Sequence, residues 1–274
     1  MPKVSLTDRP IVITGASSGI GAATAIACAR AGMPVALLAR RAGKLDAVAQ
    51  QVRSVGGRAT TVAASVDDPD SSARLLDACE AEFGPAYAAF ANAGYGQEAP
   101  CHAMDAADIR AMFETNFFAS LTLARAAADR FTQRGEGHVL LCSSCLSKLG
   151  LPYYGCYSAT KACQDHFGRA MRHELRARGV AVSTVHPIGT STEFFEATRK
   201  RSAGGTKLRD AAGGRFMQPP ERVADAIVRR LRTGSGSEIW TSLPARLAFA
   251  FSGAFPGLTD AVIARKLRNR LDQP

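Results

Sequence analysis

Tyr157 and Lys161 form the pair of side chains whose types and spacing most clearly suggest chemistry. They lie in "YYGCYSATK" (153–161), which holds three tyrosines and one lysine. A tyrosine hydroxyl is a poor proton shuttle at its ordinary pKa of about 10, and a neighbouring ammonium favours the phenolate. Helical residues four apart share one face. Only Tyr157 stands four residues from Lys161, so we expect this pair to perform acid–base chemistry, with Tyr153 and Tyr154 in a loop.

A glycine-rich turn, "TGASSGIG" (14–21), directly follows the apolar run "PIVIT" (10–14) and opens an alanine-rich, helix-compatible segment. Glycines permit a tight turn and close approach of a ligand. The start of a helix then offers free N–H groups and a positive dipole end, which suit a pyrophosphate. The turn therefore predicts a dinucleotide site. Its contacts are expected from Gly15, Ser17, Ser18, Gly19, Ile20 and Gly21.

The end of the next apolar run, "PVALLA" (34–39), indicates which dinucleotide is bound. NAD sites usually place an acid there for the ribose 2′-hydroxyl, whereas NADP sites need positive charge for a phosphate. Ala39 holds that place, and Arg40 and Arg41 follow it. Arginine offers planar, bidentate donors to phosphate. The sequence favours NADP(H) over NAD(H), with Arg40 as main ligand and Arg41 as helper; the alternative is that both are ordinary surface arginines.

The elements that position these residues alternate between short apolar runs and longer helix-compatible stretches. Such alternation predicts a parallel sheet, doubly wound, with helices on both faces. We expect one α/β domain over residues 1–274. Its seven strands are predicted near 10–14, 34–39, 58–64, 86–94, 137–144, 180–187 and 237–241. Its helices are predicted near 21–32, 43–54, 70–82, 106–133, 156–178 and 220–233.

Over roughly residues 9–240 the chain resembles the short-chain dehydrogenase/reductase family. The resemblance rests on the order and spacing of several motifs: Thr14-Gly15-x-x-x-Gly19-x-Gly21, "NAG" (92–94), Asn116, Ser144 and Tyr157-x-x-x-Lys161. It implies a Rossmann-like fold and a nicotinamide cofactor. It also implies an oxidoreductase that interconverts a hydrophobic ketone or aldehyde and its alcohol, with Tyr157 as general acid/base. The alternative we retain is a non-catalytic NADP(H) sensor with the same fold.

The resemblance also implies further roles. Lys161 is expected to hold the nicotinamide ribose, Ser144 to bind the substrate oxygen, and Asn116 to anchor a water in a proton relay. Further cofactor contacts are expected from Val66, Asn92, Ala93, Gly94, Pro187, Ile188, Thr190 and Thr192. Two positions depart from the family pattern, because Ile188 replaces a usual glycine and Ser65 a usual aspartate. Neither departure removes a catalytic group.

Composition narrows the classes of function. The net charge of +10 is spread along the chain without a basic stripe interleaved with aromatics, which argues against nucleic-acid binding. The five histidines show no metal-ligand spacing, so we expect no metal. Seven scattered cysteines and the lack of a signal-peptide pattern favour a reduced, cytoplasmic protein. Cys142-x-x-Cys145 is interpreted as a coincidence, although Cys145 near the site would confer thiol sensitivity.

The regions after the fifth and sixth strands should shape the substrate site. An apolar wall is expected from Leu146, Leu149, Leu151, Tyr154, Phe194 and Phe195. A basic mobile insertion is expected near 190–215, and a helical extension near 243–274. The extension could cover the substrate site, form a subunit interface or rest on a membrane surface, and we favour the first two. By family analogy we expect a homodimer or homotetramer.

Overall fold

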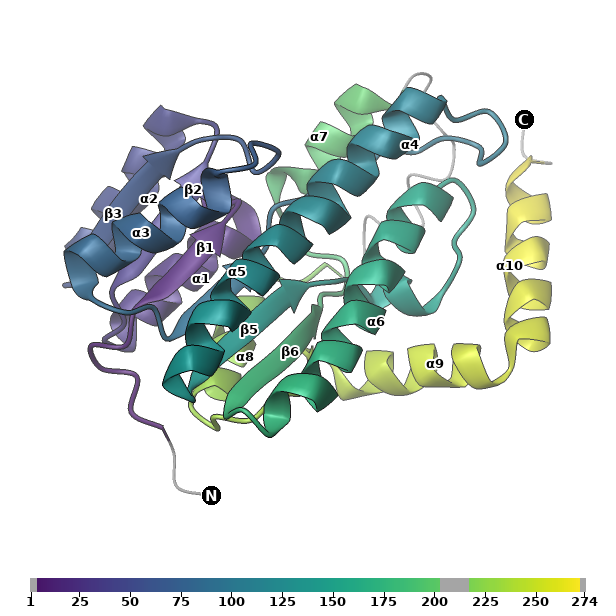
Figure 1. Cartoon of the computed structure of the whole chain (residues 1–274). Helices are drawn as coiled ribbons and strands as arrows, with labels where there is room; N and C mark the ends of the chain where they lie inside the picture. The colour runs from purple at the N-terminus through teal and green to yellow at the C-terminus, as the bar shows by residue number, and fades with distance from the viewer. Residues whose placement is uncertain (1–3, 203–216, 272–274) are drawn as a thin grey trace.

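Seven parallel strands form one sheet in the order β3-β2-β1-β4-β5-β6-β7. The structure, a computed structural model, describes residues 4–202 and 217–271. The strands are β1 (Ile11–Thr14), β2 (Val35–Ala39), β3 (Ala59–Ala63), β4 (Ala88–Ala91), β5 (Gly137–Cys142), β6 (Val180–His186) and β7 (Glu238–Trp240). The predicted doubly wound Rossmann-like sheet is thereby confirmed (Figure 1).

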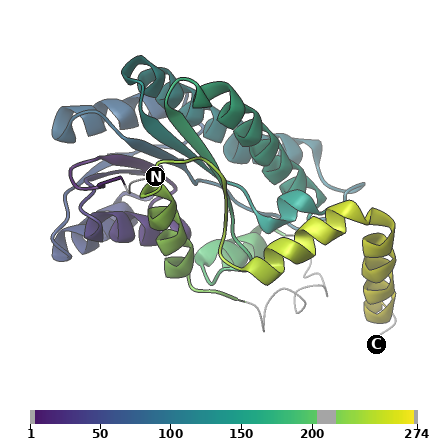
Figure 2. The same cartoon turned by 90° about the horizontal axis from the view of Figure 1, so that it is seen from below.

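Helices cover both faces of the sheet (Figures 1 and 2). One face packs against α1 (Gly19–Arg30), α2 (Ala42–Ser54) and α8 (Pro220–Leu231). The other face packs against α3 (Ser71–Phe83), α5 (Ala119–Arg134) and α6 (Gly155–Arg176). The inner strands β1, β2, β4, β5 and β6 are almost fully buried, as expected for a sheet covered on both sides, whereas the edge strands β3 and β7 are only partly buried.

The strand order reverses between β1 and β4. β1 pairs with β2 on one side and with β4 on the other, so the chain winds outward first to β3 and then, after a return, to β7. In open parallel sheets, ligands bind outside the carboxyl ends of the strands at such a switch point. Here the glycine-rich turn after β1 and the segment after β4 meet at that point.

The helical stretch expected over 106–133 is confirmed, and it contains one π-helical turn. It consists of α4 (Ala106–Phe113), a π-helical turn η1 (Glu114–Phe118) and α5. The π turn places Asn116 inside the protein, where its side chain bonds both backbone groups of Tyr95. Single π turns inside helices are rare and often occur at functional sites.

A short 3-10 helix η2 (Cys145–Lys148) follows β5, and α6 begins at Gly155 as the tyrosine spacing requires. Tyr153 has a φ of +66° and lies in the loop before α6. After β6, helix α7 (Glu193–Arg201) occupies the first part of the segment expected to be a mobile insertion. Residues 203–215 of that segment lie outside the described residues.

The chain ends in α9 (Leu243–Ala254) and α10 (Pro256–Leu271). α9 lies along the body, and α10 turns away from it (Figures 1 and 2). Among the described residues, no single helix has the length and hydropathy of a membrane span; α9 and α10 reach that length only together, and they are bent by 107°.

Candidate active site

One cavity of about 860 Å³ lies at the carboxyl edge of the sheet. Its lining includes most of the residues expected from the sequence: Gly15, Ser17, Ser18, Gly19, Ile20, Arg40, Arg41, Val66, Asn92, Ala93, Gly94, Ser144, Tyr157, Lys161, Pro187, Ile188, Thr190 and Thr192. Two expected residues, Gly21 and Asn116, are not part of the lining. The dinucleotide turn and the Tyr–Lys pair therefore share one chamber.

The turn after β1 depends on its glycines. Gly15 and Gly19 have φ values of +64° and +58°, which side chains other than glycine rarely adopt. Asn92 fixes the turn from β4, because its Nδ2 donates to the carbonyls of Thr14 (3.0 Å) and Gly15 (3.2 Å). Gly21 serves packing, since a Cβ there would lie 2.4 Å from the Gly15 carbonyl oxygen.

The amino end of α1 fits a pyrophosphate. Its N-cap Ser18 makes no side-chain capping bond, and the first turn carries no acidic residue. The first N–H groups of α1 are thus left without a capping side chain. Thr192, the N-cap of α7, borders the turn, because a Cβ on Gly19 would lie 3.0 Å from its Cγ2. These residues can hold the diphosphate of a dinucleotide.

Two arginines follow β2 where a ribose-binding acid would stand. Arg41 donates to the hydroxyls of Ser17 and Ser18, each at 3.0 Å. It also pairs with Glu193 of α7 at 2.8 Å, a residue that the sequence analysis did not single out. Arg40 lines the same cavity and is exposed. Arg41 is thus bonded to the glycine-rich turn, and Arg40 makes no ion pair among the described residues.

Ser144 and Tyr157 stand together on the cavity wall. The Ser144 Oγ accepts the backbone N–H of Leu146 at 3.1 Å, so its own O–H proton can point elsewhere. Its side chain also lies near Tyr157, whose pKa it lowers. Ser143 is taken up structurally, since its Oγ donates to the Lys161 carbonyl at 2.8 Å. Of the two adjacent serines, Ser144 is the one that faces the cavity tyrosine.

Lys161 is buried one turn after Tyr157, with its Nζ 5.7 Å from the centre of the tyrosine ring. The ammonium donates to the Cys142 carbonyl (2.7 Å) and to Gln164 Oε1 (2.9 Å). Gln164 Nε2 in turn donates to the carbonyl of Asn116 at 2.6 Å. Gln164, which the sequence analysis missed, therefore joins Lys161 to the π turn. Its i, i+3 spacing from Lys161 was the available signal.

Comparison with known proteins shows which family has this arrangement of residues. The short chain dehydrogenase profile matches residues 9–203. The chain is 34% identical over 224 residues to cis-4-hydroxycyclohexanecarboxylate dehydrogenase from Sinomonas cyclohexanicum. The matched segment covers 81% of this chain and 89% of that protein. It belongs to the short-chain dehydrogenase/reductase family. It is accordingly an oxidoreductase of the kind that uses a nicotinamide dinucleotide.

Solved structures of the family share this fold. A metagenomic short-chain oxidoreductase in complex with NADP superimposes with a TM-score of 0.71 at 28% identity, covering 86% of this chain and 97% of that one. A short-chain dehydrogenase/reductase from Burkholderia phymatum in complex with NAD gives a TM-score of 0.82 at 22% identity, covering 93% and 96%. The neighbours thus include complexes with either dinucleotide.

Burial governs the ionisation of this dehydrogenase/reductase site. It raises the pKa of the Tyr157 hydroxyl above its ordinary value, an effect that the nearby Ser144 side chain partly offsets. It lowers the pKa of the Lys161 ammonium to about 8. Burial also raises the pKa of Cys145 to about 11, so this thiol is not activated. All seven cysteines are free thiols. Tyr157 therefore holds its proton at neutral pH.

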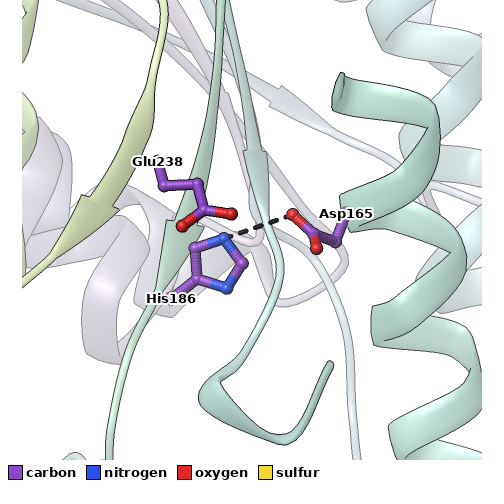
Figure 3. A group of neighbouring side chains, drawn as sticks. All are labelled: Asp165, His186 and Glu238. Carbon is purple, nitrogen blue, oxygen red and sulfur yellow. Dashed lines mark ion pairs between the residues drawn. The ribbon is translucent and has the colours of Figure 1, made fainter. Parts of the chain in front are cut away.

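A charged cluster lies behind the Ser144 loop. His186, at the end of β6, stands between Asp165 of α6 and Glu238 of β7 (Figure 3). Its Nε2 lies 3.3 Å from Asp165 Oδ1, and its Nδ1 lies 3.1 Å from the Ser144 carbonyl oxygen. The His186 ring stacks on Trp240, with centres 4.7 Å apart.

Lys148 supplies the positive charge of this cluster. Its Nζ bonds Asp165 Oδ2 at 2.5 Å and Glu238 Oε1 at 2.9 Å. Burial alone would raise the pKa of Asp165, but hydrogen bonds from His186 and Lys148 outweigh it and hold that pKa well below its ordinary value. Asp165, His186 and Glu238 come together as metal ligands would, yet the chain's own ammonium bonds both carboxylates. The absence of a metal remains an expectation.

The rest of the cavity wall is largely apolar. Leu146, Leu151, Tyr154, Phe194 and Phe195 line it as expected, whereas Leu149 does not. The sequence analysis missed the contribution of individual α9 residues, namely Pro244, Ala245, Ala248 and Phe249. α9 therefore borders the cavity; that the extension covers a substrate site stays a prediction. The ring centres of Phe194 and Tyr157 lie 5.4 Å apart, so the apolar wall reaches Tyr157.

Proposed function

We propose that this protein is an NADP(H)-dependent oxidoreductase that interconverts a hydrophobic ketone or aldehyde and its alcohol. One observation carries the proposal: the glycine-rich turn, the Ser144–Tyr157–Lys161 set and the apolar wall line the same cavity. The named activity of the Sinomonas relative, oxidation of a ring alcohol, is of the same class. Substrate pockets of this kind are mostly apolar with a few convergent polar groups.

NADP(H), when bound, supplies or accepts the hydride. The Ser144 hydroxyl donates a hydrogen bond to the carbonyl oxygen, and the Tyr157 hydroxyl gives that oxygen its proton as negative charge develops. Lys161, held by Gln164 and Cys142, favours the resulting phenolate and binds the ribose hydroxyls. In the alcohol-oxidising direction Tyr157 takes the proton back.

The preference for NADP(H) is supported by the residues after β2. Ala39 leaves the ribose-acid position without a carboxylate, and Arg40 and Arg41 border the cavity beside Ser17 and Ser18. A 2′-phosphate would meet two guanidinium groups there. The 2′-hydroxyl of NAD would meet no carboxylate at the end of β2.

A homodimer or homotetramer is supported by the outer face of η1, at the start of α5, and of α6. Phe118 and Phe167 are half exposed on this face, and each packs against Phe117, with ring centres 5.1 Å and 5.2 Å away. A second copy would cover this aromatic patch.

The test is NADPH oxidation with a panel of hydrophobic ketones and aldehydes, followed as loss of absorbance of the reduced nicotinamide. Tyr157→Phe should lower kcat by roughly 10²- to 10⁴-fold, the usual contribution of a general acid. Tyr153→Phe is the matched control, because Tyr153 lies in the adjacent loop and outside the cavity lining, and it should keep full activity. Tight NADPH binding without turnover on the whole panel would favour the sensor function instead.

A further inference from the structure

The C-terminal arm, α9 and α10, carries most of the exposed large apolar side chains among the residues that the structure describes. The described residues include eight large apolar side chains that are exposed, and six of them lie on this arm: Leu243, Leu247, Phe251, Phe255, Leu258 and Val262, between 48% and 64% exposed. Isolated exposed apolar residues are normal, but a group of this size marks an interaction surface.

The six side chains keep helical spacing on each helix of the arm. Leu243, Leu247, Phe251 and the C-cap Phe255 are four residues apart along α9, and Leu258 and Val262 are four apart on α10, so each helix carries its members on one face. The rings of Phe251 and Phe255, the C-cap of α9, pack with centres 4.7 Å apart, so the α9 part of this set reaches the bend before α10. We call this set the arm stripe.

The arm has little other support. α10 packs against α9 and stands clear of the sheet and its covering helices (Figures 1 and 2). An isolated helix of this length is marginal in water, and most helical stability comes from burying an apolar face. The arm stripe therefore needs a partner surface.

The charges on the arm indicate which partner. Its described side chains include four cations (Arg246, Arg265, Lys266 and Arg268) against one carboxylate, Asp260. A second copy docked stripe to stripe would bring these cations together, whereas an anionic lipid surface would attract them. A second copy also has the separate aromatic patch on α5 and α6. An apolar stripe combined with basic residues is the pattern of helices that lie in a membrane interface.

The bend fixes how the arm meets a bilayer. Two helices bent by 107° cannot form one straight span. Two helix axes that meet at a break do lie in one plane, so both helices can rest along a flat surface. We propose that the arm stripe docks α9 and α10 onto the surface of an anionic membrane. This proposal is independent of the proposed oxidoreductase activity, because binding to vesicles can be measured without any substrate turnover.

The experiment is co-sedimentation of the full chain with vesicles. Vesicles of phosphatidylcholine alone are compared with an equal mixture of phosphatidylcholine and phosphatidylglycerol, at low and high salt. The protein should sediment with the mixed vesicles, much less with the neutral ones, and less at high salt. Failure to sediment with the mixed vesicles at low salt would overturn the proposal.

Two variants locate the surface. Arg265→Gln/Lys266→Gln should weaken binding about 5-fold per cation, roughly 25-fold together. Its control, Arg176→Gln/Arg178→Gln, removes the same charge from exposed residues at the end of α6 and should bind as the parent does. Equal loss in both variants would reduce the interaction to general charge attraction and overturn the proposed surface.

Leu258→Ser/Val262→Ser should weaken binding about ten-fold, with Phe167→Ser as the matched control on α6. Circular dichroism checks that each variant folds. If the apolar variant does not fold, the charge variant, whose changed side chains are exposed, decides the test. Light scattering measures the oligomer. If the apolar substitutions dissociate an oligomer and leave vesicle binding unchanged, the stripe is a subunit interface and the proposal fails.

Discussion

Lys161 and Gln164 are joined by a hydrogen bond of 2.9 Å from the lysine Nζ to the glutamine Oε1. The bond lies inside the protein, where both side chains are almost fully buried. An acceptor in such a place favours the charged form of the lysine. Gln164 is thus a positioning residue that also helps to set the charge of Lys161.

Changes at Gln164 should shift the pH profile of carbonyl reduction. The reaction needs the Lys161 ammonium, whose pKa is about 8, so activity should fall as pH rises through that value. Gln164→Leu removes the acceptor and should move this fall to lower pH, whereas Gln164→Glu adds a negative charge and should move it higher. Ser120→Ala, which changes a different contact of Gln164, should leave it in place. Shifts in one common direction would contradict this role.

His186 should support catalysis by holding the Ser144 loop. His186→Phe keeps a ring to stack on Trp240 and loses the contacts with the Ser144 carbonyl and Asp165. We expect kcat to fall about ten-fold with KM for NADPH unchanged, and the free energy of unfolding to fall by about 1–3 kcal/mol as buried polar groups lose a partner. Trp240→Phe is the control, because it changes the other ring of the stack and leaves the polar contacts of His186 in place. Equal losses of kcat in the two variants would mean that ring packing, not the polar contacts, matters.

Glu193 should moderate cofactor choice. Its carboxylate pairs with Arg41 and Lys44, and their hydrogen bonds lower its pKa to about 2, so it stays ionised. A bound 2′-phosphate would compete with it for Arg41. Glu193→Gln should therefore tighten NADPH binding relative to NADH by up to about 5-fold, the scale of an exposed ion pair.

Arg41→Ala should have the opposite effect, raising KM for NADPH about ten-fold relative to NADH because a charge-assisted contact is lost. Arg53→Ala removes an arginine of α2 outside the cavity lining and should change neither KM. A parallel rise for both dinucleotides in Arg41→Ala would show that Arg41 only supports the turn.

His138 should make stability depend on pH. This β5 residue is fully buried, and burial, with Arg230 and Arg172 nearby, lowers its pKa from 6.5 to about 3. Between those values the unfolded chain binds a proton that the folded protein does not. Its contribution is therefore fully present above about pH 6.5 and is lost as pH falls toward 3, with a slope of at most ~1.4 kcal/mol per pH unit. In urea unfolding across this pH range, the free energy of unfolding of His138→Asn should depend less steeply on pH than that of the parent. Identical slopes would refute the proposed contribution of His138.

Much of the fold follows from local patterns. The strands are apolar runs bounded by glycine, proline or charged residues, and burial on both faces makes such runs recognisable. The glycine-rich turn and the four-residue spacing of Tyr157 and Lys161 are equally local. The π turn η1 within the helical stretch was not foreseen, because a π turn inserts one residue into a helix without any residue type that requires it.

The site shows the same division. Most residues carried by motifs line the cavity as expected, whereas the contacts that Glu193, His186 and the α9 side chains make with residues far away in sequence were not predicted. Arg41 meets Glu193 across 152 positions, for example. Contacts of this kind depend on how α7, β7 and α9 are placed after folding. No spacing rule predicts them.

α9 has the cavity on one side and the arm stripe on the other. Ala245, Ala248 and Phe249 line the chamber, while Leu247 and Phe251 face outward. A ligand that orders this helix from within and a surface that orders it from outside act on the same equilibrium. Thermodynamic linkage then makes the effects equal: whatever factor lipid adds to substrate affinity, substrate adds to lipid affinity.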